Sequence, residues 1–103
     1  MALLILKGNP DGKLKGEMRL APDISRALCQ AAKEAGYGTV VQLLETNGQS
    51  VLDYEDIRNL ASQLTMLETD PIATKSAYRQ LINQLRTLAT SAITSGEKII
   101  ARN

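Results

Sequence analysis

The first twenty residues constrain the fold most, because they contain two strand patterns separated by a turn signal. Residues 2–7 (ALLILK) are almost continuously apolar, which is typical of a strand that is buried on both faces. Residues 9–12 (NPDG) place proline at the second position of a β-turn and glycine at the fourth. Over residues 14–20, apolar and charged residues alternate. The sequence therefore predicts an N-terminal antiparallel β-hairpin, with a bulge at Gly12 and one solvent-exposed face.

The second predicted strand carries its charges at alternate positions. Lys13, Lys15, Glu17 and Arg19 lie two residues apart. They are therefore expected to share the exposed face of the hairpin, while Gly16 lies on the inward face. Basic side chains on a strand protect a sheet edge against unwanted pairing, and they also attract acidic partners.

A helix and an ambiguous segment follow the hairpin. Helical spacing of apolar residues predicts a helix over 24–35, capped by Asp23 and ended by Gly36. Residues 39–45 fit either a strand or a short helix. Their β-branched residues and the Asn-Gly pair that follows favour the strand.

The C-terminal half is predicted to be mostly helical. Asp53 or Ser50 is suited to cap a helix whose apolar residues repeat at three and four positions. Asp70 is expected to cap the last helix, with the following proline at its first position, and Gly96 is expected to end it. Residues 98–103 (KIIARN) fit a short strand or a loose end.

Together these elements predict an α+β fold, with an N-terminal antiparallel β-hairpin and about three helices packed on a small sheet. Neither a repeat nor a linker divides the chain, so residues 1–103 are interpreted as a single domain. The core is expected to be aliphatic, because the chain has three Tyr and neither Phe nor Trp. The residues predicted to line this core are Leu4, Leu6, Met18, Leu20, Ile24, Leu28, Ile57, Leu60, Leu64, Leu81, Leu85 and Leu88.

The absence of histidine limits the chemistry that this chain can perform. It excludes Ser-His-Asp and Cys-His catalysis and removes the commonest metal ligand. The single cysteine, Cys29, lies one residue off the apolar stripe of the first helix and is interpreted as a small buried hydrophobe. We therefore expect a protein that is not an enzyme, with no catalytic residue, no metal site and no cofactor.

Cysteine count and hydropathy indicate the compartment. One cysteine allows no disulfide within the chain, which a small secreted domain usually needs. No apolar run approaches the length of a membrane span, and the opening apolar run is too short for a signal peptide. The sequence therefore predicts a cytoplasmic protein without membrane contact.

Charge is distributed unevenly along the chain, although the net charge is +1. Residues 37–70 hold one basic and six acidic groups, whereas residues 71–103 hold five basic groups and one acidic group. Opposite charges of this kind fit two elements that face each other within one fold. They also fit a basic last helix that meets an acidic partner.

The leading functional hypothesis is a protein–protein interaction module, with a role of the immunity, adaptor or assembly-chaperone type. Its candidate interaction surface combines the basic hairpin with the start and middle of the last helix. The candidate residues are Lys13, Lys15, Arg19, Tyr78, Arg79 and Arg86. A protein partner is expected, and a homodimer stays open.

A second hypothesis is DNA binding. Residues 17–47 resemble the ribbon-helix-helix family, in which an alternating basic strand precedes two helices split by a short turn that contains glycine. The resemblance implies a dimer whose ribbon would present Lys13, Lys15, Glu17 and Arg19, with helices over 24–35 and 39–46. Near-neutral charge disfavours phosphate binding, so nucleic acid is the weaker alternative. A small ligand-binding regulator, with a pocket between sheet and helices, is the third hypothesis.

Overall fold

The computed structural model of this chain describes residues 3–8, 12 and 14–103, and for Glu17 the backbone alone. The predicted turn over 9–12, with its bulge at Gly12, includes residues outside this description, and Lys13 also lies outside it. Within the described residues, the strands are β1 (Leu3–Gly8), β2 (Leu14–Leu20), β3 (Gln49–Leu52) and β4 (Lys98–Arg102). The helices are α1 (Pro22–Ala35), α2 (Gly38–Leu44), α3 (Tyr54–Leu67), the 3₁₀ turn η1 (Pro71–Thr74) and α4 (Ser76–Ser95).

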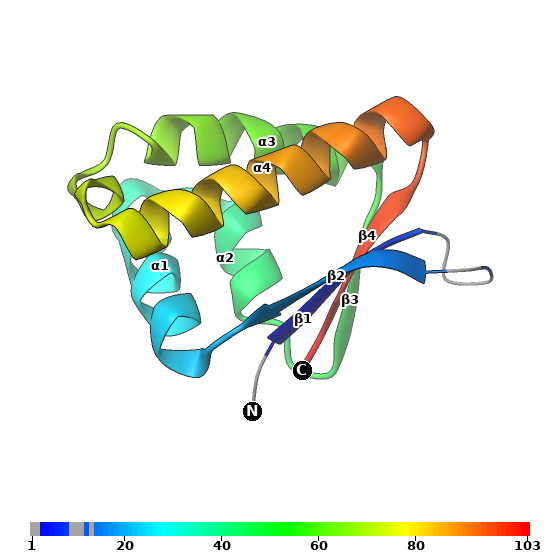
Figure 1. Ribbon diagram of the computed structural model, residues 1–103, viewed down its shortest axis with the longest axis horizontal. Coiled ribbons are helices and arrows are strands. Elements are labelled where there is room, and N and C mark those ends of the chain that lie inside the picture. Colours follow the sequence, from blue (N-terminus) through cyan, green and yellow to red (C-terminus); the bar gives the residue numbers. More distant parts are fainter. Residues whose placement is uncertain (1–2, 9–11, 13) are drawn as a thin grey trace.

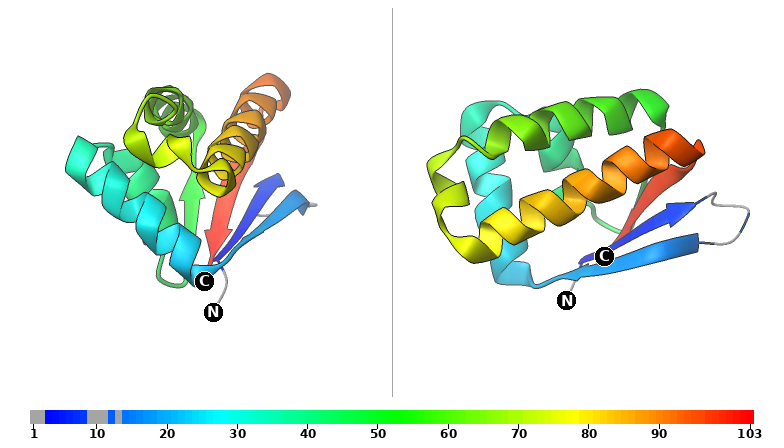
Figure 2. Two further views of the ribbon diagram at one scale, coloured as in Figure 1. Left: turned by 60° about the vertical axis from the view of Figure 1, so that its left-hand side comes forward. Right: turned by 45° about the horizontal axis from the view of Figure 1, so that its top comes forward.

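The four described strands form one antiparallel sheet in the order β2-β1-β4-β3, and the helices cover one face of it (Figures 1 and 2). The predicted α+β class and the N-terminal antiparallel hairpin are confirmed. The C-terminal tail, which also fitted a loose end, is the interior strand β4 between β1 and β3. Its Ile99, Ile100 and Ala101 are all buried, which explains why a strand at this place is apolar on both faces.

Residues 38–44 form the helix α2, so the predicted strand over 39–45 is wrong. Two tertiary features stabilise a helix here. Val40, Leu43 and Leu44 point to one side, into the core. The side-chain oxygen of Gln63, on α3, accepts hydrogen bonds from the backbone amides of Thr39 and Val40 at 3.0 and 3.1 Å. Gln63 thereby satisfies two amides that the first turn of a helix leaves unpaired.

The helix ends follow local sequence signals in part. Gly36 and Gly96 end α1 and α4 in the left-handed conformation, with φ of +80° and +70°, as predicted. Asp53 caps α3 and forms a reciprocal capping box with Asp56. Asp23, however, is not the cap of α1, because the helix begins at Pro22 and residue 23 already lies in its first turn.

Asp70 accepts a hydrogen bond from the backbone amide of Ile72, so it caps the short turn η1 and not the last helix. The helix α4 begins only at Ser76, after a break at Lys75. The predicted Asp70-Pro71 start is therefore a separate 3₁₀ turn that precedes α4.

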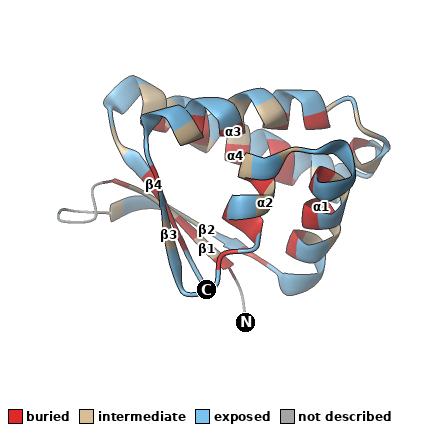
Figure 3. Ribbon diagram, turned by 180° about the vertical axis from the view of Figure 1, so that it is seen from behind, coloured by how far each residue is buried: buried red, intermediate tan, exposed pale blue. Residues whose placement is uncertain are grey.

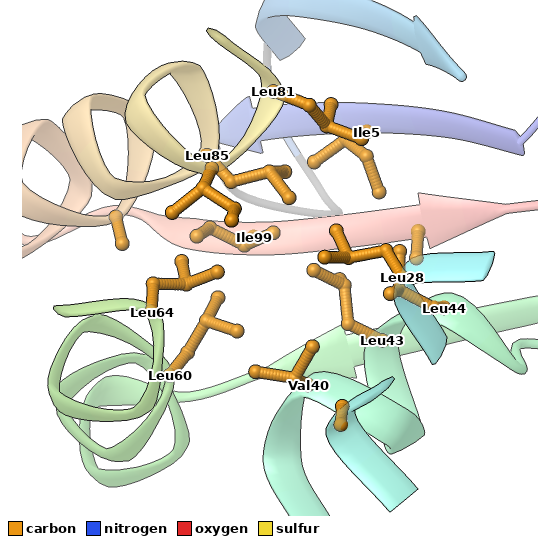
Figure 4. Close-up of a cluster of buried hydrophobic side chains, with 14 of the residues drawn as sticks. Ile5, Leu28, Val40, Leu43, Leu44, Leu60, Leu64, Leu81, Leu85 and Ile99 are labelled. Carbon is orange, nitrogen blue, oxygen red and sulfur yellow. The ribbon is translucent and has the colours of Figure 1, made fainter. Parts of the chain in front are cut away.

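The core lies between the helices and the sheet (Figure 4), and buried segments alternate with exposed ones along each α-helix (Figure 3). Leu3 and Ile5 of β1 point into this core, which places Leu4 and Leu6 on the opposite face of the sheet. The predicted buried positions Leu20, Leu28, Ile57, Leu60, Leu64, Leu81 and Leu85 are confirmed. Five other predicted core residues are only partly buried, namely Leu4, Leu6, Met18, Ile24 and Leu88.

A β-bulge lies in β2 at Gly16. The pairing register shifts between Ile5 and Lys7 of β1, so that Gly16 and Glu17 together oppose Leu6. Gly16 has φ of +67°, a left-handed conformation that an L-residue adopts only with strain. The bulge changes the phase of the strand, and side chains on its two sides no longer follow one simple alternation.

The bulge therefore separates charges that were predicted to share one face. Lys15 pairs with Lys7, whose Nζ donates to Ser91 of α4, so this pair belongs to the helix-covered side of the sheet. Arg19 pairs with Leu4 on the open side. The predicted common face for Lys15 and Arg19 is wrong, because a single inserted residue reverses the side to which the following residues point.

Candidate functional site

One concave surface of the described residues lies between β2 and α4. Two adjoining hollows share Gln84, and they have volumes of about 500 and 220 Å³. In Figure 1 and the right-hand view of Figure 2, α4 extends over the same span as β2. We call this surface the α4–β2 groove. Its lining residues are Gly16, Met18, Arg19, Leu20, Ala21, Ile24, Ala77, Gln80, Leu81, Asn83, Gln84, Thr87, Leu88 and Ser91.

The strand side of the groove is supplied by β2. Met18 and Leu20 lie two residues apart beyond the bulge and share the helix-covered side of the strand, and Gly16 lines the same hollow as Met18. A side chain at residue 16 would fill part of this space, because a Cβ built there lies 3.4 Å from Cδ1 of Leu88. Glycine at position 16 therefore permits the left-handed conformation of the bulge, and it also leaves the groove open.

The helix side of the groove is a stripe of small and neutral residues on α4. Ala77, Gln80, Gln84, Thr87 and Ser91 lie three or four residues apart and so share one face of the helix. These residues were not among the predicted site residues, because only the apolar stripe of this helix stands out in the sequence. The signal was present, since the stretch QLINQLRTLATSAITS carries one charged residue where a solvated helix surface usually carries several.

Among the residues that the structure describes, the lining of the groove contains one charged residue, Arg19, which lies at its rim because it pairs with Leu4 on the open side. The outer side of β2 also lacks a strand partner among the described residues, because β2 is the edge of the sheet and pairs with β1 alone. An edge strand directs backbone N–H and C=O groups outward. The groove therefore combines apolar residues of β2 with neutral residues of α4, and it adjoins the outward-directed main-chain N–H and C=O groups of the β2 edge.

A polar cluster lies at the end of the groove nearest the bulge. Lys7 Nζ donates to Ser91 Oγ at 2.6 Å and lies 3.6 Å from Glu97 Oε1. The Ser95 hydroxyl donates to the same carboxylate at 2.6 Å. The Ser95 hydrogen bond is the main cause that lowers the pKa of Glu97, and Lys7 and Lys15 add to it. Because an ammonium has no lone pair, Lys7 in this ion pair holds Ser91 in place and does not activate it as a nucleophile.

The candidate residues on the last helix face other parts of the chain. Arg86 forms an ion pair with Glu68 at 2.8 Å, and Arg79 Nε donates to the backbone oxygen of Ala73 at 3.1 Å. Both guanidinium groups therefore bind neighbouring elements of the fold.

Tyr78 is half-buried, with the Lys75 ammonium 5.9 Å from its ring centre. Of the candidate interaction residues, Arg19 lines the α4–β2 groove and Lys15 lies next to its Gly16 end. Lys13 lies outside the described residues.

A separate hollow, of about 500 Å³, lies outside the α4–β2 groove, where α1 approaches the end of α2. Cys29 lies in its wall, beside an ion pair of Lys33 with Glu45. Burial and the neighbouring Glu45 carboxylate raise the pKa of the Cys29 thiol, which disfavours the reactive thiolate. No group of three or more acidic or thiol ligands suited to a metal ion occurs among the residues that the structure describes.

Comparison with models of protein families, with curated proteins and with solved structures finds no match to this chain. In the described part of the chain, no helix has the length and hydropathy needed to cross a bilayer.

Proposed function

We propose that this chain is a non-enzymatic protein interaction module that binds an extended segment of a partner protein in the α4–β2 groove. The observation that carries the proposal is the course of the groove along an edge strand. An extended segment can add to such an edge through main-chain hydrogen bonds, while its alternate side chains enter the groove. A role of the immunity, adaptor or assembly-chaperone type requires docking of this kind and no catalytic group.

The dimensions support an extended segment. The stripe from Ala77 to Ser91 spans about 21 Å at 1.5 Å per helical residue. On the strand side the lining runs from Gly16 to Leu20, and these five residues span about 16 Å at 3.3 Å per strand residue. The strand side of the groove thus accommodates about five residues of extended chain. The apolar floor at Met18, Leu20 and Leu88 favours aliphatic side chains at alternate positions of that segment.

Exposed basic side chains on β2 favour a partner segment of opposite or neutral charge. Lys15 and Arg19 are both exposed. A segment with acidic or neutral residues between its apolar ones fits this strand without repulsion.

DNA binding is the weaker candidate, although the helix α2 agrees with the second helix of the ribbon-helix-helix resemblance. The bulge at Gly16 divides the basic side chains between two faces, which reduces the charge available to one phosphate backbone. The strand β2 also pairs with β1 of its own chain. We further propose a cytoplasmic location, since a buried lone cysteine needs no oxidising compartment.

The proposal is tested with a display library of random nine-residue peptides, selected on the immobilised chain. We expect enriched peptides to alternate aliphatic with polar or acidic residues. Binding of a selected peptide is then measured by fluorescence anisotropy. Gln84→Arg places a long charged side chain where the two hollows meet and should weaken binding about tenfold or more. Asn59→Arg, on the exposed side of α3, is the matched control and should leave binding unchanged.

Three outcomes would overturn the proposal. The first is a failure to enrich any peptide, and the second is binding that Gln84→Arg does not affect. The third is a homodimer in light scattering that Gln84→Arg dissociates, which would assign the groove to a second copy. Binding to generic duplex DNA that falls steeply with salt would favour the alternative function.

A further inference from the structure

We infer that Asn47 is a site of spontaneous covalent modification, at which the side-chain amide is lost and the residue becomes aspartate or isoaspartate. Asn47 precedes Gly48, and neither residue lines the α4–β2 groove, so the inference is independent of the proposed function. The reaction needs an asparagine side chain that is open to attack, a following backbone nitrogen that is free to attack it, and water.

The side chain of Asn47 is open to attack. The residue lies in the link between α2 and β3 and is exposed. Its side-chain amide makes no hydrogen bond to another described residue. Exposure alone does not distinguish it, because Asn59 on α3 and Asn83 on α4 are exposed as well. The difference lies in the backbone nitrogen that follows each asparagine.

The backbone nitrogen of Gly48 is free, whereas those that follow Asn59 and Asn83 are engaged. Leu60 and Gln84 lie inside helices, where the amide N–H bonds to the carbonyl of the preceding turn. Gly48 precedes β3, and its N–H donates to no described residue. Its φ is +88°, and a Cβ built on it would meet no atom within 4 Å. Without a side chain of its own, Gly48 leaves its nitrogen accessible to the neighbouring side chain.

The reaction consumes only water and releases ammonia. Hydroxide removes the proton of the Gly48 amide, and the nitrogen attacks Cγ of Asn47. The new N–Cγ bond closes a succinimide ring, the Cγ–Nδ2 bond breaks, and ammonia leaves with a proton from water, which restores the hydroxide. Water then adds to one of the two ring carbonyls and breaks its bond to nitrogen. Opening at one carbonyl gives aspartate, and opening at the other gives isoaspartate. Asparagine is accordingly one of the thermolabile residues.

The modification site lies between two carbonyl groups that hold Asn103 beside β3. The backbone oxygen of Gly48 accepts from the Asn103 amide at 2.8 Å, and that of Thr46 accepts from Asn103 Nδ2 at 3.1 Å. Isoaspartate inserts a methylene group into the main chain between these two oxygens. The hydroxyl of Thr46 also donates to the Leu43 carbonyl at 2.9 Å, which fixes one side of the link. We therefore expect isoaspartate to break at least part of this attachment.

The test follows the purified chain during prolonged incubation. Peptide mapping by mass spectrometry measures the loss of amide at each asparagine, and a protein isoaspartate methyltransferase with labelled methyl donor measures isoaspartate. Asn47 should convert about tenfold faster than Asn59 or Asn83, because a helical amide must first break its hydrogen bond. Conversion at Asn47 should also rise about tenfold between about pH 7 and about pH 8, since hydroxide generates the attacking nitrogen.

Two variants separate the reaction from its consequence. Asn47→Gln should abolish conversion at this position, because the longer side chain would have to close a larger ring. Asn47→Asp carries the new charge without the inserted methylene group. The urea midpoint of the incubated chain should fall by about 0.5 M, as for one lost main-chain hydrogen bond, whereas that of Asn47→Asp should not change.

The inference is overturned if Asn47 converts no faster than Asn59 and Asn83, or if the rate does not depend on pH. Equal urea midpoints for the incubated chain and Asn47→Asp would overturn the expected loosening of Asn103. None of these outcomes affects the proposed function, because peptide binding in the α4–β2 groove is measured separately.

Discussion

Truncation of Leu85 tests the packing of α4 against the sheet. Leu85 is 1% exposed and lies among Ile5, Leu64, Leu81 and Ile99 (Figure 4). Leu85→Ala removes a buried side chain whose transfer from water is worth about 1.5–3 kcal/mol, and the cavity left behind adds to this loss. We therefore expect the free energy of unfolding to fall by about 3–5 kcal/mol, a large part of the roughly 5–15 kcal/mol typical of a domain.

Urea unfolding followed by circular dichroism measures this loss. With a slope of about 1.5 kcal/mol per M, a loss of about 3 kcal/mol lowers the urea midpoint by about 2 M. Leu88→Ala is the matched control, since it makes the same change one turn away at a half-buried position on the groove. It should cost about 1 kcal/mol. A loss below about 1 kcal/mol for Leu85→Ala, or a larger loss for Leu88→Ala, would refute the assignment of these two faces of α4.

Two further substitutions test the cap of α3 and the ion pair between α1 and α2. Asp53→Ala removes the carboxylate that accepts from the Asp56 amide, and it should lower the free energy of unfolding by about 1 kcal/mol in the same urea assay; no loss would mean that this cap contributes nothing to stability. The hydrogen bond from Lys33 is the main cause that lowers the pKa of Glu45. The stability that this ion pair contributes is therefore present above the ordinary carboxylate pKa, and it is lost as the pH falls through the lowered pKa. Between about pH 6 and pH 3, the urea midpoint of the wild-type chain should therefore fall further than that of Glu45→Gln, and parallel curves would contradict this expectation.

Features that depend on a few neighbouring residues could be predicted from the sequence. Gly36 and Gly96 end helices because only glycine adopts their left-handed conformation cheaply, wherever the helix packs. Asp53 caps α3 because its carboxylate reaches an amide three residues away. The amphipathic stripe of α4 likewise predicted that Leu81 and Leu85 are buried.

The candidate site was predictable only in part. The edge position of the basic strand followed from the hairpin, but its bulge at Gly16 did not. A glycine in a strand is equally compatible with an inward-facing position, and only the register with β1 shows the inserted residue. The groove also required the placement of α4 beside β2, two elements separated by more than fifty residues in the chain. From the sequence alone, the element that lies beside the neutral stripe from Ala77 to Ser91 could not be identified.

The sequence by itself determined the fold class, the glycine ends of α1 and α4, the cap of α3 and the absence of imidazole chemistry, because each depends on composition or on contacts within about four residues. The tertiary structure decided the rest. Residues 38–44 became a helix because Gln63, far along the chain, satisfies their first amides. The tail became the interior strand β4 because β1 and β3 both pair with it. Pairing and register of this kind depend on contacts between distant segments, to which local periodicity is insensitive.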